Sequence, residues 1–282
     1  MAYEQFRPNR PNLFPPVVKN LLILNVLIFA ATWVVDDKYG IDLTNYLGLH
    51  YFTSQYFRPY QFVTYMFMHG SIDHIFFNMF ALWMFGNALE NLWGAKRFLI
   101  FYFITGIGAA LIYTGYEAFQ YNHLHQIVDA FSANPNPTDY LSLFQKHFGG
   151  YLDIPDIQLQ VTQFTQDWAN HLGDPAYNSR AISDFNQLLS LQVDNPMVGA
   201  SGAVFGILVG FGMLFPNTEL FLMFIPIPVK AKYAVVLYAA IELFLGVAQF
   251  SGDNIAHFAH LGGALVGFIM IKYWQKNSKR FY

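Results

Sequence analysis

A single serine, Ser201, stands at the start of an apolar run that reaches Phe215. Glycines flank it at Gly199 and Gly202, so the backbone there can approach other groups closely. A serine in this position usually serves only as a helix cap. A helix beginning here would also point free N–H groups and the positive end of its dipole at an oxyanion formed at Ser201. Because a nucleophilic serine needs a base, the chemistry depends on a second group.

Other polar side chains recur at the starts of apolar segments. His74 and Asn78 are one turn apart on the same face of a predicted helix. His260 lies six residues into the apolar segment 254–274, roughly 9 Å along a helix. Such groups are costly in hydrocarbon and are expected to face a bundle interior or a water-filled cavity.

The composition indicates a polytopic membrane protein. Hydrophobic residues make up 55% of the 282 residues and charged residues 12%, whereas soluble proteins carry roughly 25% charged residues. The absence of cysteine excludes disulfides, thiolate catalysis and cysteine-ligated zinc. A net charge of −3 without a basic, aromatic-rich patch argues against nucleic-acid binding.

The apolar segments predict an all-α fold with six transmembrane helices and a polar insertion between the third and fourth. We predict spans at residues 17–35, 71–92, 98–116, 201–215, 233–250 and 254–274. The organisation is then a cytoplasmic segment (1–16), core spans one to three (17–117), an extracytoplasmic insertion (118–196), core spans four to six (197–275) and a basic cytoplasmic tail (276–282). We expect a few helices in the insertion, which is too short and polar to predict a core of its own.

Charge asymmetry sets the orientation. The ends of the chain and two short loops are basic, with Arg7, Arg10, Lys19, Lys96, Arg97, Lys230, Lys232 and Lys276 on one side. The other side carries Asp36, Asp37, Asp42, Asp253 and the acidic insertion. The excess of lysine and arginine predicts cytoplasmic termini, with the first span serving as an uncleaved anchor. Spans two, four and six then all begin at the outer face, which brings Ser201, His74 and His260 to a similar depth.

Small residues recur every four positions on spans four and six: Gly202, Gly206 and Gly210 on one, and Ala259, Gly263 and Gly267 on the other. Such faces allow helix backbones to approach closely, although by themselves they more often indicate packing than catalysis. Close approach is what a serine–histidine hydrogen bond of about 2.6–3.2 Å requires.

The chain resembles the rhomboid intramembrane serine proteases. The resemblance rests on three motifs that occur in order on spans of the same orientation: Gly199-Ala200-Ser201-Gly202, His260-x-x-Gly263-x-x-x-Gly267 and His74-x-x-x-Asn78, with His69 before the last of these. It covers all six spans but not the insertion. Two features depart from the family pattern: the long insertion, and Phe57-Arg58 where many members have Trp-Arg.

The resemblance implies a serine endopeptidase that cleaves transmembrane segments of membrane proteins near the extracytoplasmic face. Ser201 would be the nucleophile and His260 the base, as a dyad without a third acidic member. The Ser201 N–H, His74 and Asn78 would form the oxyanion hole. Supporting roles would fall to His69, Gly199, Gly202, Phe205 stacked on His260, Gly263 and Gly267. Glu90 fits a structural hydrogen-bonding role, and the turn before span six would belong to a mobile cap.

The resemblance implies no metal or other cofactor, and its partners would be transmembrane substrates and the lipid bilayer, in a bacterial cytoplasmic membrane. Two alternatives remain. A catalytically inactive rhomboid-like adaptor would bind transmembrane clients, but such relatives are expected to lose the serine or the histidine. A metal- or haem-binding redox protein would use His69, His74, His257 and His260. The scattered histidines of the insertion, His123, His125, His147 and His171, are expected at its surface.

Overall fold

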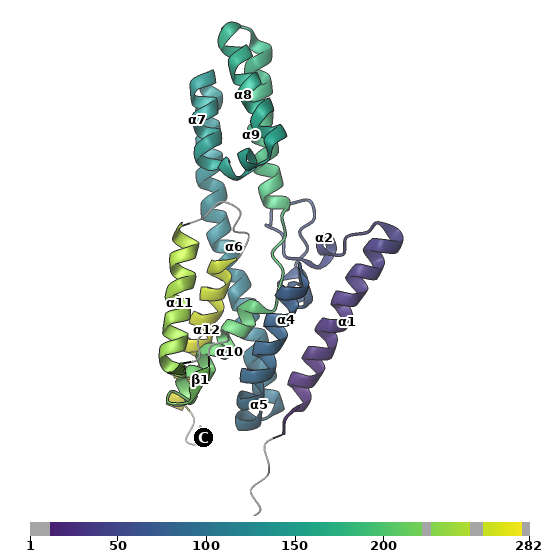
Figure 1. Ribbon diagram of the computed structural model, residues 1–282, viewed down its shortest axis with the longest axis vertical. Coiled ribbons are helices and arrows are strands. Elements are labelled where there is room, and N and C mark those ends of the chain that lie inside the picture. The colour runs from purple at the N-terminus through teal and green to yellow at the C-terminus, as the bar shows by residue number, and fades with distance from the viewer. Residues whose placement is uncertain (1–11, 222–226, 249–255, 278–282) are drawn as a thin grey trace, which may run out of the picture.

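The computed structural model describes residues 12–221, 227–248 and 256–277. These residues are mostly helical, with one antiparallel hairpin of β1 (Glu219–Phe221) and β2 (Pro228–Lys230) (Figure 1). The longer helices are α1 (Pro16–Tyr39), α4 (Ile72–Ala81), α5 (Asn87–Trp93), α6 (Ala95–Ala133), α7 (Pro137–His147), α8 (Pro155–Asn170), α9 (Pro175–Asp194), α10 (Ser201–Leu214), α11 (Ala231–Ala248) and α12 (His257–Asn277). Short turns complete the order: α2 (Thr44–Leu47), α3 (Gln61–Thr64), η1 (Tyr65–Phe67), η2 (Leu82–Gly86) and η3 (Gly149–Asp153).

Each of the six predicted spans falls on helix in the described residues. Among these, α1, α6 and α11 are long and apolar enough to cross a membrane, and α10 is a shorter apolar helix. The second predicted span consists of α4 and α5 joined by the π-helical turn η2. Ser71 is the N-cap of α4, and its side chain accepts a hydrogen bond from the His74 N–H at 3.1 Å.

Helix α6 is much longer than the predicted third span. It continues from the apolar region through residue 118 to Ala133 without a break. The sequence offers no proline or glycine between Gly115 and Pro135, so nothing in this stretch interrupts the helix. The polar insertion is therefore joined to the apolar part of the fold by a continuous helix (Figure 1).

The insertion has a core of its own, which its length and polarity did not predict. Helices α7 and α9 pack against the far end of α6, and α8 packs against α7, beyond the other helices (Figure 1). Amphipathic sequences supply the buried side chains: Val128, Phe131, Tyr140, Phe144, Phe148, Val161, Phe164, Trp168, Ala181, Phe185, Leu188 and Leu189. Seven aromatic rings in a small bundle bury enough apolar area to hold the helices together.

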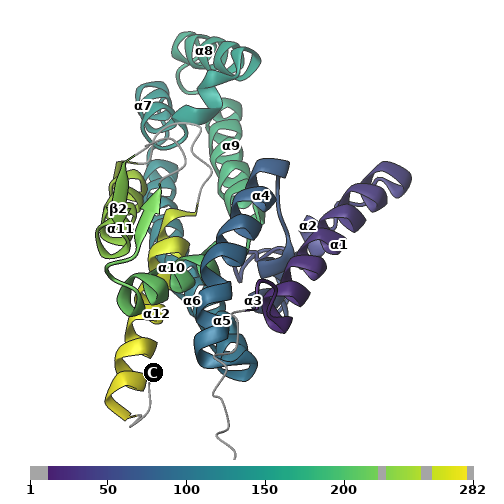
Figure 2. The same cartoon turned by 60° about the horizontal axis from the view of Figure 1, so that its bottom comes forward.

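Helix α10 packs against both α6 and α12 (Figure 2). A Cβ atom on Gly263 of α12 would lie 1.8 Å from the carbonyl oxygen of Gly202, so the two backbones are in direct contact there. One turn along, a Cβ on Gly267 would lie 2.9 Å from the Gly206 Cα. On its other side α10 meets α6, where a Cβ on Gly202 would lie 2.6 Å from Ala109 Cβ. The small residues thus set the separation of three helices.

Glu90 fixes the start of α1 against α5. Its carboxylate accepts hydrogen bonds from the Val17 and Val18 N–H groups at 2.9 and 2.8 Å. These are N–H groups that a helix start leaves without an intrahelical partner. The expected structural role of Glu90 is confirmed. Away from this contact α1 diverges from the other helices (Figure 1).

Several sequence predictions lie outside the described residues. These are the basic residues Arg7 and Arg10, the turn at 251–253 with its expected cap function, and the tail beyond Asn277.

Candidate active site

Ser201 is the first residue of α10, and its side chain is not a cap. Ala200 takes the N-cap position and makes no side-chain hydrogen bond. The Ser201 Oγ instead lies 2.7 Å from His260 Nε2. The two residues are 59 positions apart in sequence and meet because Gly263 lets α12 touch α10 at Gly202.

The His260 ring is held from one face by Phe205. The two rings are parallel, 7° apart, with centroids separated by 4.4 Å. Phe205 lies one turn after Ser201 on α10, so the same helix carries the hydroxyl and the ring that restrains its partner. His260 is buried in this position.

Glu242 on α11 makes the third contact to His260. Its Oε2 atom lies 2.8 Å from His260 Nδ1 and 2.7 Å from His257 Nδ1. The side chains of Glu242 and His260 are 9% and 11% exposed. The structure thus places a carboxylate against His260, whereas the resemblance implied a dyad without a third acidic member. A signal was present in the sequence, because Glu242 interrupts an otherwise apolar segment and ionisable residues within such segments are commonly functional.

His74 borders the same region from α4. A Cβ atom on Gly199 would lie 2.7 Å from His74 Nε2 and 3.4 Å from Ser201 Oγ. The side chains of His74 and Ser201 thus both lie close to the position that a Cβ atom on Gly199 would occupy. Gly199 has φ of 128°, a conformation that suits glycine, and its N–H donates to the Tyr65 carbonyl at 3.0 Å.

Asn78 and His69 lie beside His74. Asn78 is buried, and its Nδ2 donates to the His74 carbonyl at 3.1 Å, so in this structure its amide is bonded within α4. The His69 ring lies edge-on to the His74 ring, with centroids 5.0 Å apart. Burial, with His74 acting in the same direction, lowers the pKa of His69 to about 3. His69 is therefore neutral at physiological pH.

Arg58 makes local contacts in the loop before α3. Its Nη1 atom donates to the carbonyls of Gln55 and Phe57 at 3.1 and 2.7 Å. These contacts stabilise the loop conformation. They are all within three residues of Arg58 in the sequence.

A cavity of about 330 Å³ lies between the middle of α6, the C-terminal ends of α9 and α11 and the start of α12. Its lining is largely polar and includes Tyr113, Glu117, Gln120, Gln192 and His257. Through His257, which contacts Glu242, this cavity adjoins the group around His260. A polar space of this size can hold several water molecules.

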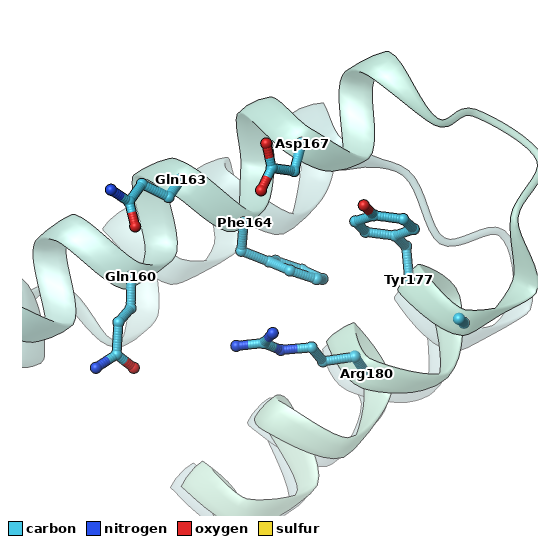
Figure 3. A pocket seen from close by; sticks show the side chains of 7 residues that line it. Gln160, Gln163, Phe164, Asp167, Tyr177 and Arg180 are labelled. Atoms are coloured by element: carbon cyan, nitrogen blue, oxygen red, sulfur yellow. The ribbon is translucent and has the colours of Figure 1, made fainter.

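A larger cavity, of about 440 Å³, is formed between α8 and α9 in the insertion (Figure 3). Phe164, Tyr177 and Arg180 point into it from the two helices (Figure 3), with Arg180 4.7 Å above the Phe164 ring. None of its lining residues belongs to the group around Ser201. This larger cavity is therefore separate from the candidate active site.

The histidines divide into separate groups. In the part of the chain that the structure describes, Glu242, His257 and His260 place three potential metal-ligand atoms within 4.8 Å of one another. His69 and His74 are not members of this set. The histidines of the insertion, His123, His125, His147 and His171, are exposed or half-buried, as expected.

Comparison with known proteins gives the family. A rhomboid domain model matches residues 56–127 and 177–276, and the unmatched stretch between them falls in the insertion. Rhomboid protein 1, mitochondrial, of Saccharomyces cerevisiae is 23% identical over 270 residues, covering 94% of this chain and 54% of the yeast protein. The rhomboid protease GlpG of Yersinia pestis is 24% identical over 92 residues, 33% of this chain and 32% of GlpG.

The chain thus spans about half the length of the yeast relative. Its match to GlpG spans about a third of GlpG. The family model, in contrast, covers more than half of this chain and includes Ser201, His260, His74 and Asn78. The protein therefore belongs to the rhomboid family and is a multi-pass helical membrane protein.

Proposed function

We propose that this protein is an intramembrane serine endopeptidase that cleaves transmembrane segments of membrane proteins near the extracytoplasmic face. The observation that carries the proposal is the 2.7 Å separation of Ser201 Oγ and His260 Nε2. A serine hydroxyl within hydrogen-bond reach of an oriented imidazole is the arrangement that activates a nucleophile.

The reaction follows from this contact. Ser201 Oγ forms a bond to the scissile carbonyl carbon while its proton moves to His260 Nε2. The tetrahedral intermediate collapses with cleavage of the C–N bond, and His260 returns the proton to the leaving amine. Water, deprotonated by His260, then attacks the acyl-enzyme and releases the carboxylic acid and free Ser201.

The negative charge on the tetrahedral oxygen needs donors close to Ser201. His74 supplies one, because its Nε2 lies beside Gly199 and Ser201. The Ser201 N–H, at the first turn of α10, supplies another, since the first N–H groups of a helix lack intrahelical partners. Asn78 would serve after its amide leaves the His74 carbonyl. Such donors are typically worth about 10²–10³-fold in kcat each.

The membrane arrangement supports an outward-facing site. If the six helical spans have cytoplasmic termini, as the distribution of basic residues predicts, the starts of α4, α10 and α12 lie at the outer face. The polar cavity beside His257 provides a route for water. Substrate helices must unwind to expose a carbonyl, so helix-breaking residues near the cut would favour cleavage. A bacterial cytoplasmic membrane is the proposed location.

Labelling with a fluorophosphonate tests the proposal. The probe should attach to Ser201, and labelling should disappear in Ser201→Ala and His260→Ala, while cleavage of a model transmembrane substrate falls at least about 10³-fold. Ser190→Ala, at an exposed position on α9, is the matched control and should label normally. Undiminished cleavage by Ser201→Ala would refute the proposal. A protein that binds the substrate without cleaving or labelling would instead be the membrane adaptor.

A further inference from the structure

We propose that Glu242 is a positioning residue that sets the tautomer of His260 and stabilises its protonated form during catalysis. This inference rests on the proposed function of Ser201 and His260. It assigns a third member to a reaction that two side chains would otherwise carry out.

The hydrogen-bond pattern determines which nitrogen of His260 is the base. An ionised carboxylate only accepts hydrogen bonds, and Glu242 Oε2 lies 2.8 Å from His260 Nδ1. The proton of the neutral ring is therefore held on Nδ1. The lone pair is then on Nε2, which faces Ser201 Oγ at 2.7 Å. Without this acceptor, the other tautomer would present an N–H to the hydroxyl and could not remove its proton.

His257 holds the carboxylate in place. Its Nδ1 lies 2.7 Å from the same Oε2 atom, and it precedes His260 by nearly one turn on α12. Two donors to one oxygen fix the Glu242 side chain in a position where it is largely shielded from solvent. Gly246, one turn after Glu242 on α11, allows this approach, because a Cβ there would lie 3.1 Å from His257 Cβ.

The carboxylate also matters after proton transfer. When His260 takes the Ser201 proton, the ring becomes a cation next to Glu242 in a poorly solvated position. An adjacent anion stabilises that state, and the proton stays on Nδ1 rather than passing to the carboxylate. Phe205 stacked on the ring face keeps the ring in the plane that both contacts require.

The same three side chains are less suited to holding a divalent cation. A tetrahedral zinc ion with bonds of about 2.0–2.1 Å separates its ligand atoms by about 3.3 Å. Glu242 Oε2 is instead 2.7 and 2.8 Å from the two histidine nitrogens. These separations are those of charge-assisted hydrogen bonds.

Two substitutions separate an electrostatic role from a structural one. Glu242→Gln preserves shape but removes the charge, whereas Glu242→Asp preserves the charge but shortens the side chain. We expect kcat to fall by about 10²-fold or more in the Gln variant and by less in the Asp variant, with KM nearly unchanged in both. If Glu242 had a purely structural role, the Gln variant, which keeps the shape of the side chain, would have a higher kcat than the shortened Asp variant. Glu90→Gln, the same change at another buried glutamate, is the matched control and should keep kcat per folded molecule.

The outcomes are distinct from those that test the proposed function. A Gln variant with wild-type kcat, or with higher kcat than the Asp variant, would overturn the role of Glu242. If Ser201→Ala is inactive in the same assay, the proposed protease function is still supported in that case. If the Gln variant does not fold, the Asp variant decides: lower kcat at unchanged KM supports the role and wild-type kcat refutes it. Activity should be unchanged by EDTA. Inactivation by EDTA and recovery with zinc would assign the cluster to a metal instead.

Discussion

Gly199 leaves the space that the His74 ring occupies: a Cβ atom on Gly199 would lie 2.7 Å from His74 Nε2. The same atom would be 3.4 Å from Ser201 Oγ. The glycine before the serine thus determines how closely the histidine of α4 can approach the start of α10.

Gly199→Ala should abolish most activity while leaving the helices folded. The added methyl group would displace His74, and a φ of 128° is strained for alanine, at a cost of about 1–3 kcal/mol. Cleavage of a model substrate and fluorophosphonate labelling measure the effect. Gly149→Ala, where a Cβ meets nothing within 4 Å, is the control. Wild-type kcat in Gly199→Ala would contradict the close approach.

Gly263→Ala should separate α12 from α10. Its Cβ would lie 1.8 Å from the Gly202 carbonyl oxygen, which neither backbone can accommodate without moving. Overpacking of this kind costs about 1–3 kcal/mol or more, and the shift would also lengthen the Ser201–His260 contact. We expect a lower thermal midpoint in detergent together with lost labelling. Gly115→Ala on α6, with open space around it, should show neither effect.

Phe205→Ala should lower kcat by loosening the His260 ring. Aromatic stacking contributes about 0.5–1.5 kcal/mol beyond buried area, which corresponds to roughly a twofold to twelvefold loss if the restraint acts in the transition state. Phe205→Tyr keeps the ring and should stay near wild type. Steady-state kinetics on detergent-solubilised protein compares the two variants. Equal kcat in all three proteins would show that the stack has no catalytic consequence.

Glu90→Ala should weaken the attachment of α1. The substitution leaves the Val17 and Val18 N–H groups without the carboxylate that accepts from them, and an unsatisfied buried donor costs about 1–3 kcal/mol. Thermal unfolding in detergent should show a lower midpoint. The rate of Ser201 labelling in the folded fraction should not change, because the hydrogen bonds of Glu90 are to the start of α1. A stability equal to wild type would count against the capping role.

Phe185→Ala should unfold the insertion. Phe185 is fully buried at the centre of the bundle and contacts the rings of Phe131, Tyr140 and Phe144. Removing a core phenylalanine costs about 3–5 kcal/mol, more than a small bundle is expected to tolerate. Limited proteolysis should then cut α7 to α9 rapidly. Phe119→Ala, at a side chain 70% exposed, should remain as resistant as wild type.

The sequence was informative where glycine spacing and the orientation of the spans constrain which residues meet. Ser201 and His260 could be predicted as a pair because glycine spacing and orientation place both near one face of the bundle. The resemblance implied a hydrogen-bonding role for Glu90, and the helix start that its carboxylate caps gives the physical reason. The contact of Glu242 with His260 could not be predicted, because it depends on how α11 is rotated about its own axis. An apolar sequence around a single charge does not specify that rotation.

The core of the insertion could not be predicted for a related reason. Its mean polarity suggested weak packing, yet the aromatic residues of α7, α8 and α9 are concentrated on the faces that meet. Composition averages over those faces, whereas burial depends on their alignment. The end of α6 was misplaced because the change from apolar to polar residues after residue 116 marks a change of surroundings and not the end of a helix.

The uninterrupted course of α6 has a mechanical consequence. One end of this rod bears the folded insertion, and its middle presses Ala109 and Thr105 against Gly202 and Gly206 on the helix of the serine. A stiff helix transmits tilt along its length. A force applied to the folded insertion would thus be delivered along α6, which has no break between the two, to the wall directly behind Ser201.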